Sequence, residues 1–226
     1  MSVSNLTGSC LTGQPKSTYY RQITDMKPQA VVLVLPILVA CGGGARSPAA
    51  PVPVPVGRPA VSPADVLFMS GMIPHHAQAV KIAGWAPSHG ARPDIQVLAQ
   101  RIVVAQRDEI ALMQNWLRDR GQPVPAADAT RHKMVMNGIT HDMLMPGMMT
   151  DEELAQLDGA RGSAYDRLFL TFMVRHHEGA ITMVDQLFAA NGAGQDEVVF
   201  RFGSDVHADQ STEIERMQKM LATISQ

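Results

Sequence analysis

The chain has 226 residues, of which 46% are hydrophobic, so it can bury one sizeable core. Its formal net charge of −2 gives no sign of a nucleic-acid-binding surface. Its two cysteines are too few for a disulfide framework or a thiolate zinc site. Aromatic residues make up only 5%, whereas methionine occurs 15 times, so the unusual supply in this sequence is methionine and histidine.

Residues 1–41 have the layout of a secretory signal peptide. An apolar run at 30–40 follows Lys27 and is too short to span a bilayer. The run ends in Leu-Val-Ala followed by Cys41, which resembles the lipobox of bacterial lipoproteins, and we therefore expect Cys41 to be lipidated. The alternative is a buried core helix that ends in a chance cysteine. Because signal peptides seldom carry a long polar segment before their charged region, we expect translation to begin at Met26 and residues 1–25 to be a mis-assigned start.

Residues 42–62 are rich in glycine and proline and predict a tether. Alternating prolines favour polyproline II, which rises about 3.1 Å per residue, so this segment could reach roughly 60 Å. Such a tether would hold a lipid-anchored domain away from a membrane. A flexible linker without a spacing role is equally consistent with the composition.

From Ser62 onward the chain contains an internal repeat. The motif Ser-x-x-Asp-x-x-Phe-x-x-x-Met-x-x-His-His occurs at 62–76 and again, 101 positions later, at 163–177. A second motif, Gln-x-x-Glu-Ile-x-x-Met, occurs at 106–113 and again, 104 positions later, at 210–217. Two matches in the same order indicate that one helical hairpin was duplicated.

Capping residues and helix breakers predict four long helices and one short one. Ser62 and Ser163 are expected as N-caps, and Thr150 with Glu153 reads as a capping box. The expected helices span about 63–83, 93–120, 151–158, 164–190 and 196–223. Apolar residues recur every three or four positions in the long helices, which predicts an all-α four-helix bundle over 63–224, made of two duplicated hairpins and a Met-rich connector.

Several polar residues occupy positions that a bundle normally fills with apolar ones. His76 and His177 fall on apolar stripes, whereas His75 and His176 are expected near the edge, within reach of Met72 and Met173 one turn earlier. Four more polar residues fill gaps in the stripes of the other two long helices, namely Gln106, Glu109, Gln210 and Glu213.

Burying a carboxylate without a partner costs several kcal/mol, so Glu109 and Glu213 need partners. The histidine pairs on the neighbouring helix of each hairpin are the expected ones. Two interpretations remain open: a hydrogen-bonded network that fixes helix register, or metal ligation, since neutral imidazole and carboxylate are common ligands.

The connector at 132–149 concentrates sulfur and imidazole side chains. Its candidate metal ligands are Met134, Met136, His141, Met143, Met145, Met148 and Met149. Thioether sulfur is a soft donor that favours Cu(I) or Ag(I) over hard cations. The alternative is that these methionines are flexible packing residues that cover the bundle.

Several enzyme signatures are absent from the sequence. It contains no Walker loop, no nucleophile elbow and no haem-attaching Cys-x-x-Cys-His. The Glu-x-x-His motif of di-iron carboxylate bundles is also missing. We therefore expect no organic cofactor and do not favour an enzyme.

The paired His-His motifs, the Gln-x-x-Glu-Ile-x-x-Met motifs and the Met-rich connector resemble the bacterial domain of unknown function family 305. The resemblance spans about residues 63–222. It implies a ferritin-like helical fold and, for some members, an envelope location with copper binding and resistance. The implied site residues are Met72, His75, His76, Met113, Met173, His176, His177 and Met217. This sequence departs from the pattern at Pro74, which is expected to kink the first helix, and at Gln78, where the second copy has glycine.

The sequence thus predicts a lipoprotein of the bacterial cell envelope that faces the periplasm or the cell exterior. We expect it to bind copper, as Cu(I), through methionine and histidine, for sequestration or for handover to a metal-transfer partner. One alternative is a ferritin-like metal-dependent oxidoreductase that uses His76, Glu109, His177 and Glu213 as a core centre. Another is a metal-free structural adaptor.

Overall fold

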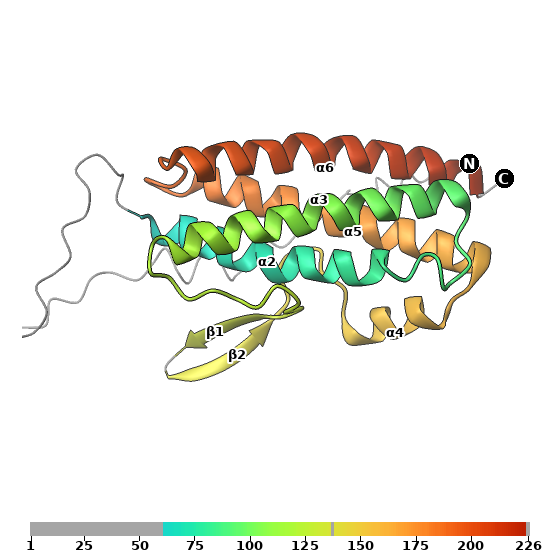
Figure 1. Cartoon of the computed structure of the whole chain (residues 1–226), viewed down its shortest axis with the longest axis horizontal. Helices are drawn as coiled ribbons and strands as arrows, with labels where there is room; N and C mark the ends of the chain where they lie inside the picture. The colour runs from blue at the N-terminus through green and yellow to red at the C-terminus, as the bar shows by residue number, and fades with distance from the viewer. Residues whose placement is uncertain (1–60, 137, 225–226) are drawn as a thin grey trace, which may run out of the picture. The chain divides into compact units, whose positions relative to one another are not determined.

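In the computed structural model, the described residues are 61–136 and 138–224 (Figure 1). The predictions for the signal region, for Cys41 and for nearly all of the tether lie outside this range. The described residues form five helices: α2 (Pro63–Ala83), α3 (Pro93–Arg118), α4 (Asp151–Gly159), α5 (Gly162–Ala189) and α6 (Glu197–Ile224). The predicted all-α class is confirmed. Among the described residues, no helix combines the length and the apolar character needed to cross a membrane.

Two of the three predicted helix caps are present. The Ser62 Oγ accepts a hydrogen bond from the Ala64 amide at 3.1 Å. Thr150 and Glu153 form the reciprocal capping box at the start of α4. The Ser163 cap is wrong, because α5 already begins at Gly162, whose amide donates to the His89 carbonyl.

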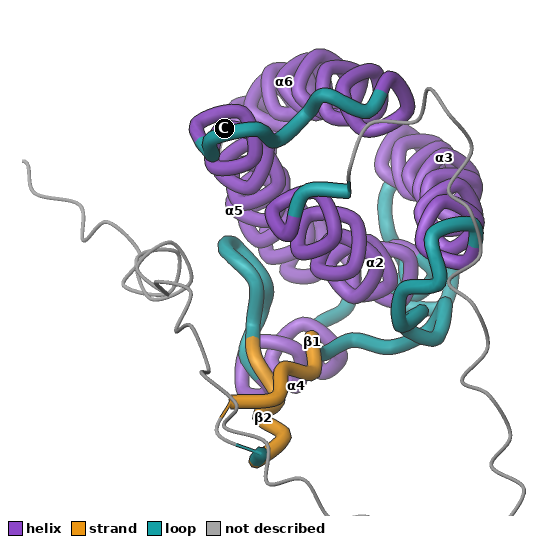
Figure 2. Tube along the Cα trace, turned by 90° about the vertical axis from the view of Figure 1, so that its left-hand side faces the viewer, coloured by secondary structure: helices purple, strands orange, loops and turns teal. Residues whose placement is uncertain are grey.

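The four long helices lie side by side around a common axis (Figure 2). Helices α2 and α3 pack along each other as one hairpin, α5 and α6 as the other, and α2 packs beside α5. Helices α3 and α6 are also neighbours but approach each other less closely. The duplicated hairpins therefore meet through their first helices.

Equivalent aspartates of the two repeats tie the hairpins together. The Asp65 carboxylate accepts from the Gly194 amide at 2.7 Å, in the loop between α5 and α6. The Asp166 carboxylate accepts from the Arg92 amide at 3.2 Å, in the loop between α2 and α3. Burial raises the pKa of both carboxyls, and these backbone hydrogen bonds oppose the rise. An aspartate of each repeat thus hydrogen-bonds the loop that joins the two helices of the other repeat.

The connector contains a β-hairpin followed by a buried loop. Strand β1 (His132–Met136) pairs antiparallel with β2 (Ile139–Met143), and the hairpin lies outside the four long helices (Figures 1 and 2). Helix α2 continues through Pro74, so the proline is accommodated without ending the helix.

Candidate metal-binding site

All four histidines of the duplicated motif lie in the interior, each with 0% of its surface exposed. His75 of α2 and His176 of α5 face each other, with ring centroids 3.8 Å apart and ring planes inclined by 37°. The prediction that these two lie near the edge is therefore wrong. A helix that packs against neighbours on more than one side buries more than one stripe, so both members of each pair can be enclosed.

The second histidine of each pair contacts the carboxylate predicted for it. The His177 Nε2 donates to Glu213 Oε2 at 2.7 Å, between α5 and α6. The His76 Nε2 lies 2.8 Å from Glu109 Oε2, between α2 and α3, but without hydrogen-bond alignment. The expected pairing within each hairpin is confirmed, and the two pairs repeat the duplication of the sequence.

The central imidazoles are held in the neutral form. Burial lowers the pKa of His75 and of His176 well below the usual value of 6.5, and the neighbouring imidazoles lower both further. The His75 Nε2 donates to the Pro146 carbonyl at 3.0 Å, which leaves Nδ1 as the acceptor. Neutral imidazole with a free acceptor nitrogen is the form that binds metal.

Several of these ring nitrogens have no hydrogen-bond partner among the described residues. They are Nδ1 of His75 and His177 and both ring nitrogens of His76 and His176. A closed structural network would satisfy its buried members, because an unpaired buried polar atom is costly. These unpartnered nitrogens are the atoms of the four histidines that could serve as metal ligands.

The methionines implied by the family resemblance are all buried in the two apolar clusters of the core. Met72 and Met113 belong to the cluster that also contains Phe68. Met173 and Met217 belong to the cluster that contains Phe169. Each repeat therefore contributes two of these thioethers to the protein interior, where the four imidazoles are also buried.

The four residues proposed for an oxidoreductase centre form two separate pairs. Within residues 61–136 and 138–224, no three side chains of His, Cys, Asp or Glu converge as they would around one ion. A core centre built from His76, Glu109, His177 and Glu213 requires all four together. The geometry gives the oxidoreductase alternative no support.

The loop after the hairpin is inserted against α2 and α5. Its methionines Met145, Met148 and Met149 are buried in the core clusters. The side-chain amide of Gln78 donates to the Met149 carbonyl at 3.0 Å and accepts from the Met149 amide at 2.7 Å. Gln78 was identified in the sequence only as a departure from the repeat, and its position in the fold shows that it anchors this loop.

The hairpin places its soft donors on one face. Met134 lies directly opposite His141, and His132 directly opposite Met143. Side chains two residues apart on a strand share a face, so these four lie together, whereas Lys133 and Asp142 form an ion pair on the other face. Met136, also predicted as a ligand, pairs with Ile139 in the same ladder.

His132 joins the hairpin to the first helix. Pro74 has no amide hydrogen, so the carbonyl of Ser70, four residues earlier, lacks its helical donor. The His132 side chain hydrogen-bonds this carbonyl, while burial lowers the pKa of His132. The proline of the first repeat thus creates the acceptor to which the hairpin is attached.

The fold and the site define a small helical protein whose interior is rich in thioether and imidazole donors. Residues 65–221 match the family model of the domain of unknown function DUF305, and the chain belongs to this family. A DUF305 protein from Streptomyces coelicolor, described as a secreted protein, has a similar structure with a TM-score of 0.59 and 26% identity, covering 72% of this chain and 94% of that one. A DUF305 fragment from Deinococcus radiodurans gives 0.59 and 26%, covering 73% and 99%.

The chain is also similar to CopM in its Cu(II)-bound form, with a TM-score of 0.55 and 26% identity over 70% of this chain and 96% of that one. CopM structures in Cu(I)-bound and silver-bound forms match as well. A curated relative, the uncharacterized protein L153 of Acanthamoeba polyphaga mimivirus, is 36% identical over 56 residues, which is 25% of this chain. The chain spans 37% of that relative's length.

Proposed function

We propose that this protein binds copper, as Cu(I), in the bacterial cell envelope, for sequestration or for handover to a metal-transfer partner. The observation that carries the proposal is the hairpin face, where Met134 lies opposite His141 and His132 opposite Met143. Directly opposed side chains have Cβ atoms about 5 Å apart, so one ion can be bound from both strands. Thioether and imidazole together select a soft monovalent ion over hard cations.

The buried histidines supply a second group of donors. His75, His76, His176 and His177 would act with Met72, Met113, Met173 and Met217, and the connector would add Met136, Met145, Met148 and Met149. The unpartnered nitrogens described above support this role. No thiolate is required, which suits an oxidising compartment, where free thiols are lost to disulfides.

The relatives support both the metal and the location. CopM was crystallised with Cu(II), Cu(I) and silver, and silver is a common stand-in for Cu(I). The Streptomyces coelicolor protein is described as secreted, which agrees with a location outside the cytoplasm. Lipidation at Cys41 would then anchor the domain to a membrane through the tether at 42–62.

Competition with a chromogenic Cu(I) chelator tests the proposal. The protein should withdraw Cu(I) from the chelator, and the double variant M134L/M143L should withdraw less, because it loses a thioether from each strand. The matched control is M69L/M183L, which removes two buried thioethers that are not among the proposed ligands. The proposal fails if the protein does not compete at micromolar Cu(I), and the hairpin's role fails if the two variants bind equally.

A further inference from the structure

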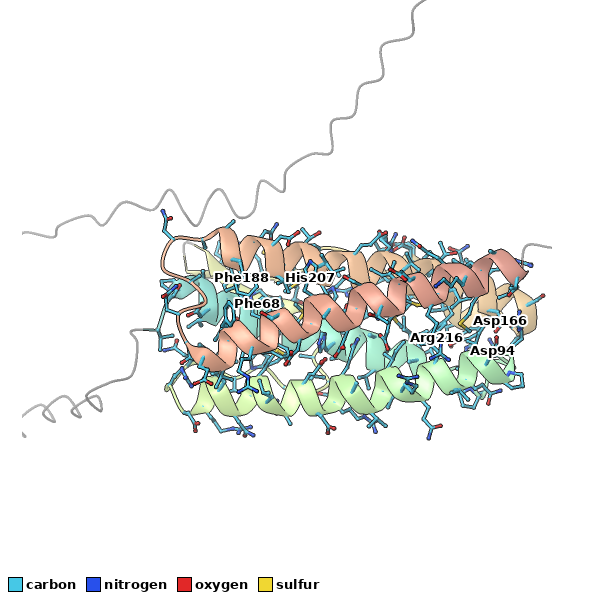
Figure 3. The ribbon with its side chains drawn as sticks, turned by 90° about the horizontal axis from the view of Figure 1, so that it is seen from above. Phe68, Asp94, Asp166, Phe188, His207 and Arg216 are labelled. Carbon is cyan, nitrogen blue, oxygen red and sulfur yellow. The ribbon has the colours of Figure 1, made fainter. Side chains whose placement is uncertain are left out.

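A pocket that we call the acidic pocket lies between α3 and α6, on the face viewed in Figure 3, and its side chains differ chemically from the proposed copper ligands. It has a volume of about 220 Å³, which is room for several water molecules at roughly 30 Å³ each. The side chains that offer donors to it come from equivalent positions of the two repeats, Gln106 and Glu109 on α3 and Gln210 and Glu213 on α6, and Asp209 joins them. These side chains offer carboxylate and amide oxygens. Arg101 also lines the pocket, and sulfur is absent from its described lining.

The two glutamines point to a ligand. Gln106 is 3% exposed and Gln210 is 4% exposed, and the Oε1 atom of each has no hydrogen-bond partner among the described residues. Leaving a buried amide oxygen without a partner is destabilising. Two such oxygens at symmetry-equivalent positions of one pocket are therefore costly unless something in the pocket binds them.

The carboxylates of the pocket are held in place from the interior. His76 and His177 contact Glu109 and Glu213 from the core side, while these carboxyl side chains remain 23% and 25% exposed toward the pocket. Asp209 lines the same pocket. Burial raises the pKa of its carboxyl group, and the charges of Glu109, Asp205 and Glu213 raise this pKa further. Three carboxylates are thus gathered at one place, and the hydrogen bond with His177 orients that of Glu213.

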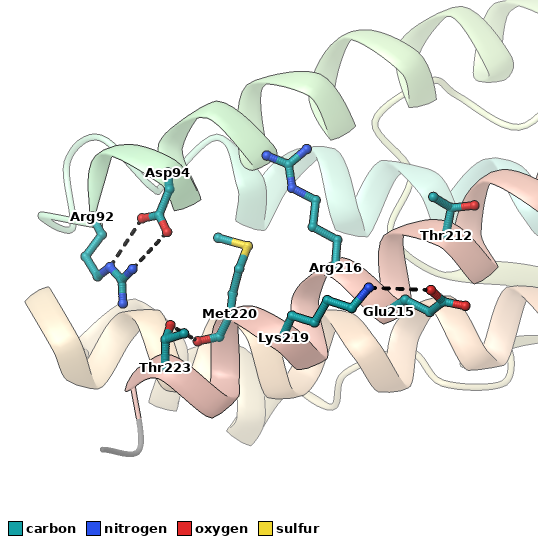
Figure 4. A pocket seen from close by; sticks show the side chains of 8 residues that line it. All are labelled: Arg92, Asp94, Thr212, Glu215, Arg216, Lys219, Met220 and Thr223. Carbon is teal, nitrogen blue, oxygen red and sulfur yellow. Dashed lines mark hydrogen bonds and ion pairs between the residues drawn. The ribbon is translucent and has the colours of Figure 1, made fainter.

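The neighbouring pocket on the same face differs in charge. It is larger, about 500 Å³, and shares Thr212 with the acidic pocket. It contains two ion pairs, Arg92 with Asp94 and Lys219 with Glu215, and Arg216 adds a further positive charge (Figure 4). The acidic pocket is lined by three carboxylates, of Glu109, Asp209 and Glu213, and by one cationic side chain, Arg101, so negative charge is in excess there.

We propose that the acidic pocket binds a partly hydrated divalent cation of the hard, oxygen-preferring class, such as Mg²⁺ or Mn²⁺. Carboxylate and amide oxygens are the ligands of this class. No three carboxylates or imidazoles of the described residues converge closely enough to enclose a bare ion, so the cation retains water, as Mg²⁺ commonly does. This site offers oxygen atoms, whereas the proposed copper ligands are sulfur and nitrogen atoms. The two sites adjoin, because His76 and His177 contact Glu109 and Glu213.

Titration of the full chain with Mn(II), followed by the loss of the free-ion EPR signal, tests this proposal. The protein should take up Mn(II), and Mg²⁺ should displace it. The variant Q106L/Q210L removes both unpartnered oxygens but keeps the interior filled, and E213Q removes one carboxylate charge. Each should weaken Mn(II) binding about tenfold or more, as the loss of orienting or ligating groups does.

The matched control is E215Q, which removes one carboxylate charge from the same helix outside the acidic pocket. It should bind Mn(II) like the parent chain, and so should M134L/M143L, so a failure of the copper proposal would be separate from a failure here. Helical circular dichroism identifies any variant that does not fold. The proposal is overturned if the parent chain takes up no Mn(II) at millimolar concentration, if Q106L/Q210L binds as tightly as the parent, or if E215Q weakens binding as much as E213Q.

Discussion

Gly179 and Gln78 occupy equivalent positions of the two repeats. They differ because the single connector between the repeats contacts each of them in a different way. Gln78 binds the connector backbone at Met149 through both ends of its amide. Gly179 lets the same connector approach α5 closely, since a Cβ at Gly179 would lie 2.7 Å from the Gly147 Cα and would overlap the Pro146 carbonyl. The sequence revealed this departure from the repeat, but its cause is contact with the connector, 71 residues from Gln78 and about thirty from Gly179, which no local pattern encodes.

The substitution Gly179→Ala should therefore destabilise the protein by about 1–3 kcal/mol, because backbone atoms must move to admit the methyl group. Urea unfolding followed by circular dichroism measures this change. Gly159→Ala is the control, since a Cβ at Gly159, the last residue of α4, meets nothing within 4 Å. That variant should be neutral or slightly stabilising, as helix propensity favours alanine. Equal losses in both variants would contradict the close-approach argument.

At the level of the elements, the β-hairpin is the part of the connector that the sequence prediction missed. The available signal was Asn-Gly at 137–138, a common two-residue turn between strands. The flanking residues do not alternate between apolar and polar side chains, so periodicity gave no support for strands. The long helices were predicted within two residues of their observed ends, because proline, glycine and capping side chains mark those ends locally.

The attachment of the hairpin to α2 predicts an energetic coupling between Pro74 and His132. The variant His132→Phe keeps an aromatic ring but leaves the Ser70 carbonyl without a donor, so it should destabilise the protein and speed amide exchange in β1. In a Pro74→Ala background the helix supplies its own donor to that carbonyl. His132→Phe should then cost less, by roughly 1 kcal/mol.

A double-mutant cycle of Pro74→Ala and His132→Phe, measured by urea unfolding, gives this coupling directly. His141→Phe, on the exposed part of β2, is the control and should show no coupling to Pro74→Ala. Additive effects of Pro74→Ala and His132→Phe would mean that the proline does not create the acceptor.

On the scale of the whole molecule, the duplication made the fold and the His–Glu pairs predictable. Each pair joins the two helices of one hairpin, and the two motifs that supply its members occur twice in the sequence in the same order. The contact between the rings of His75 and His176 was not predictable in this way, because it depends on how the two hairpins meet. Helical periodicity orders the residues of one helix around its axis but does not say how many neighbours that helix will have.

This central contact makes the stability of the protein depend on pH. Burial, with help from neighbouring imidazoles, holds the pKa of His75 and His176 well below 6.5 in the folded chain, whereas the unfolded chain has ordinary values. Below about pH 6.5 the unfolded state therefore binds more protons than the folded state. Stability should be complete above this pH and should fall as the pH is lowered, by up to about 1.4 kcal/mol per pH unit for each histidine.

Urea unfolding at several pH values between about 7.5 and 5, with a chelator present to exclude metal binding, measures this slope. The variant His176→Phe removes one of the two central imidazoles and leaves His75 beside an apolar ring, so the slope should decrease. His207→Phe removes an exposed imidazole on α6, and its stability should depend on pH with the same slope as in the parent chain. An unchanged slope in His176→Phe would mean that the acid sensitivity arises elsewhere. Protonation of the histidines at the junction of the two repeats would then not be what destabilises the fold.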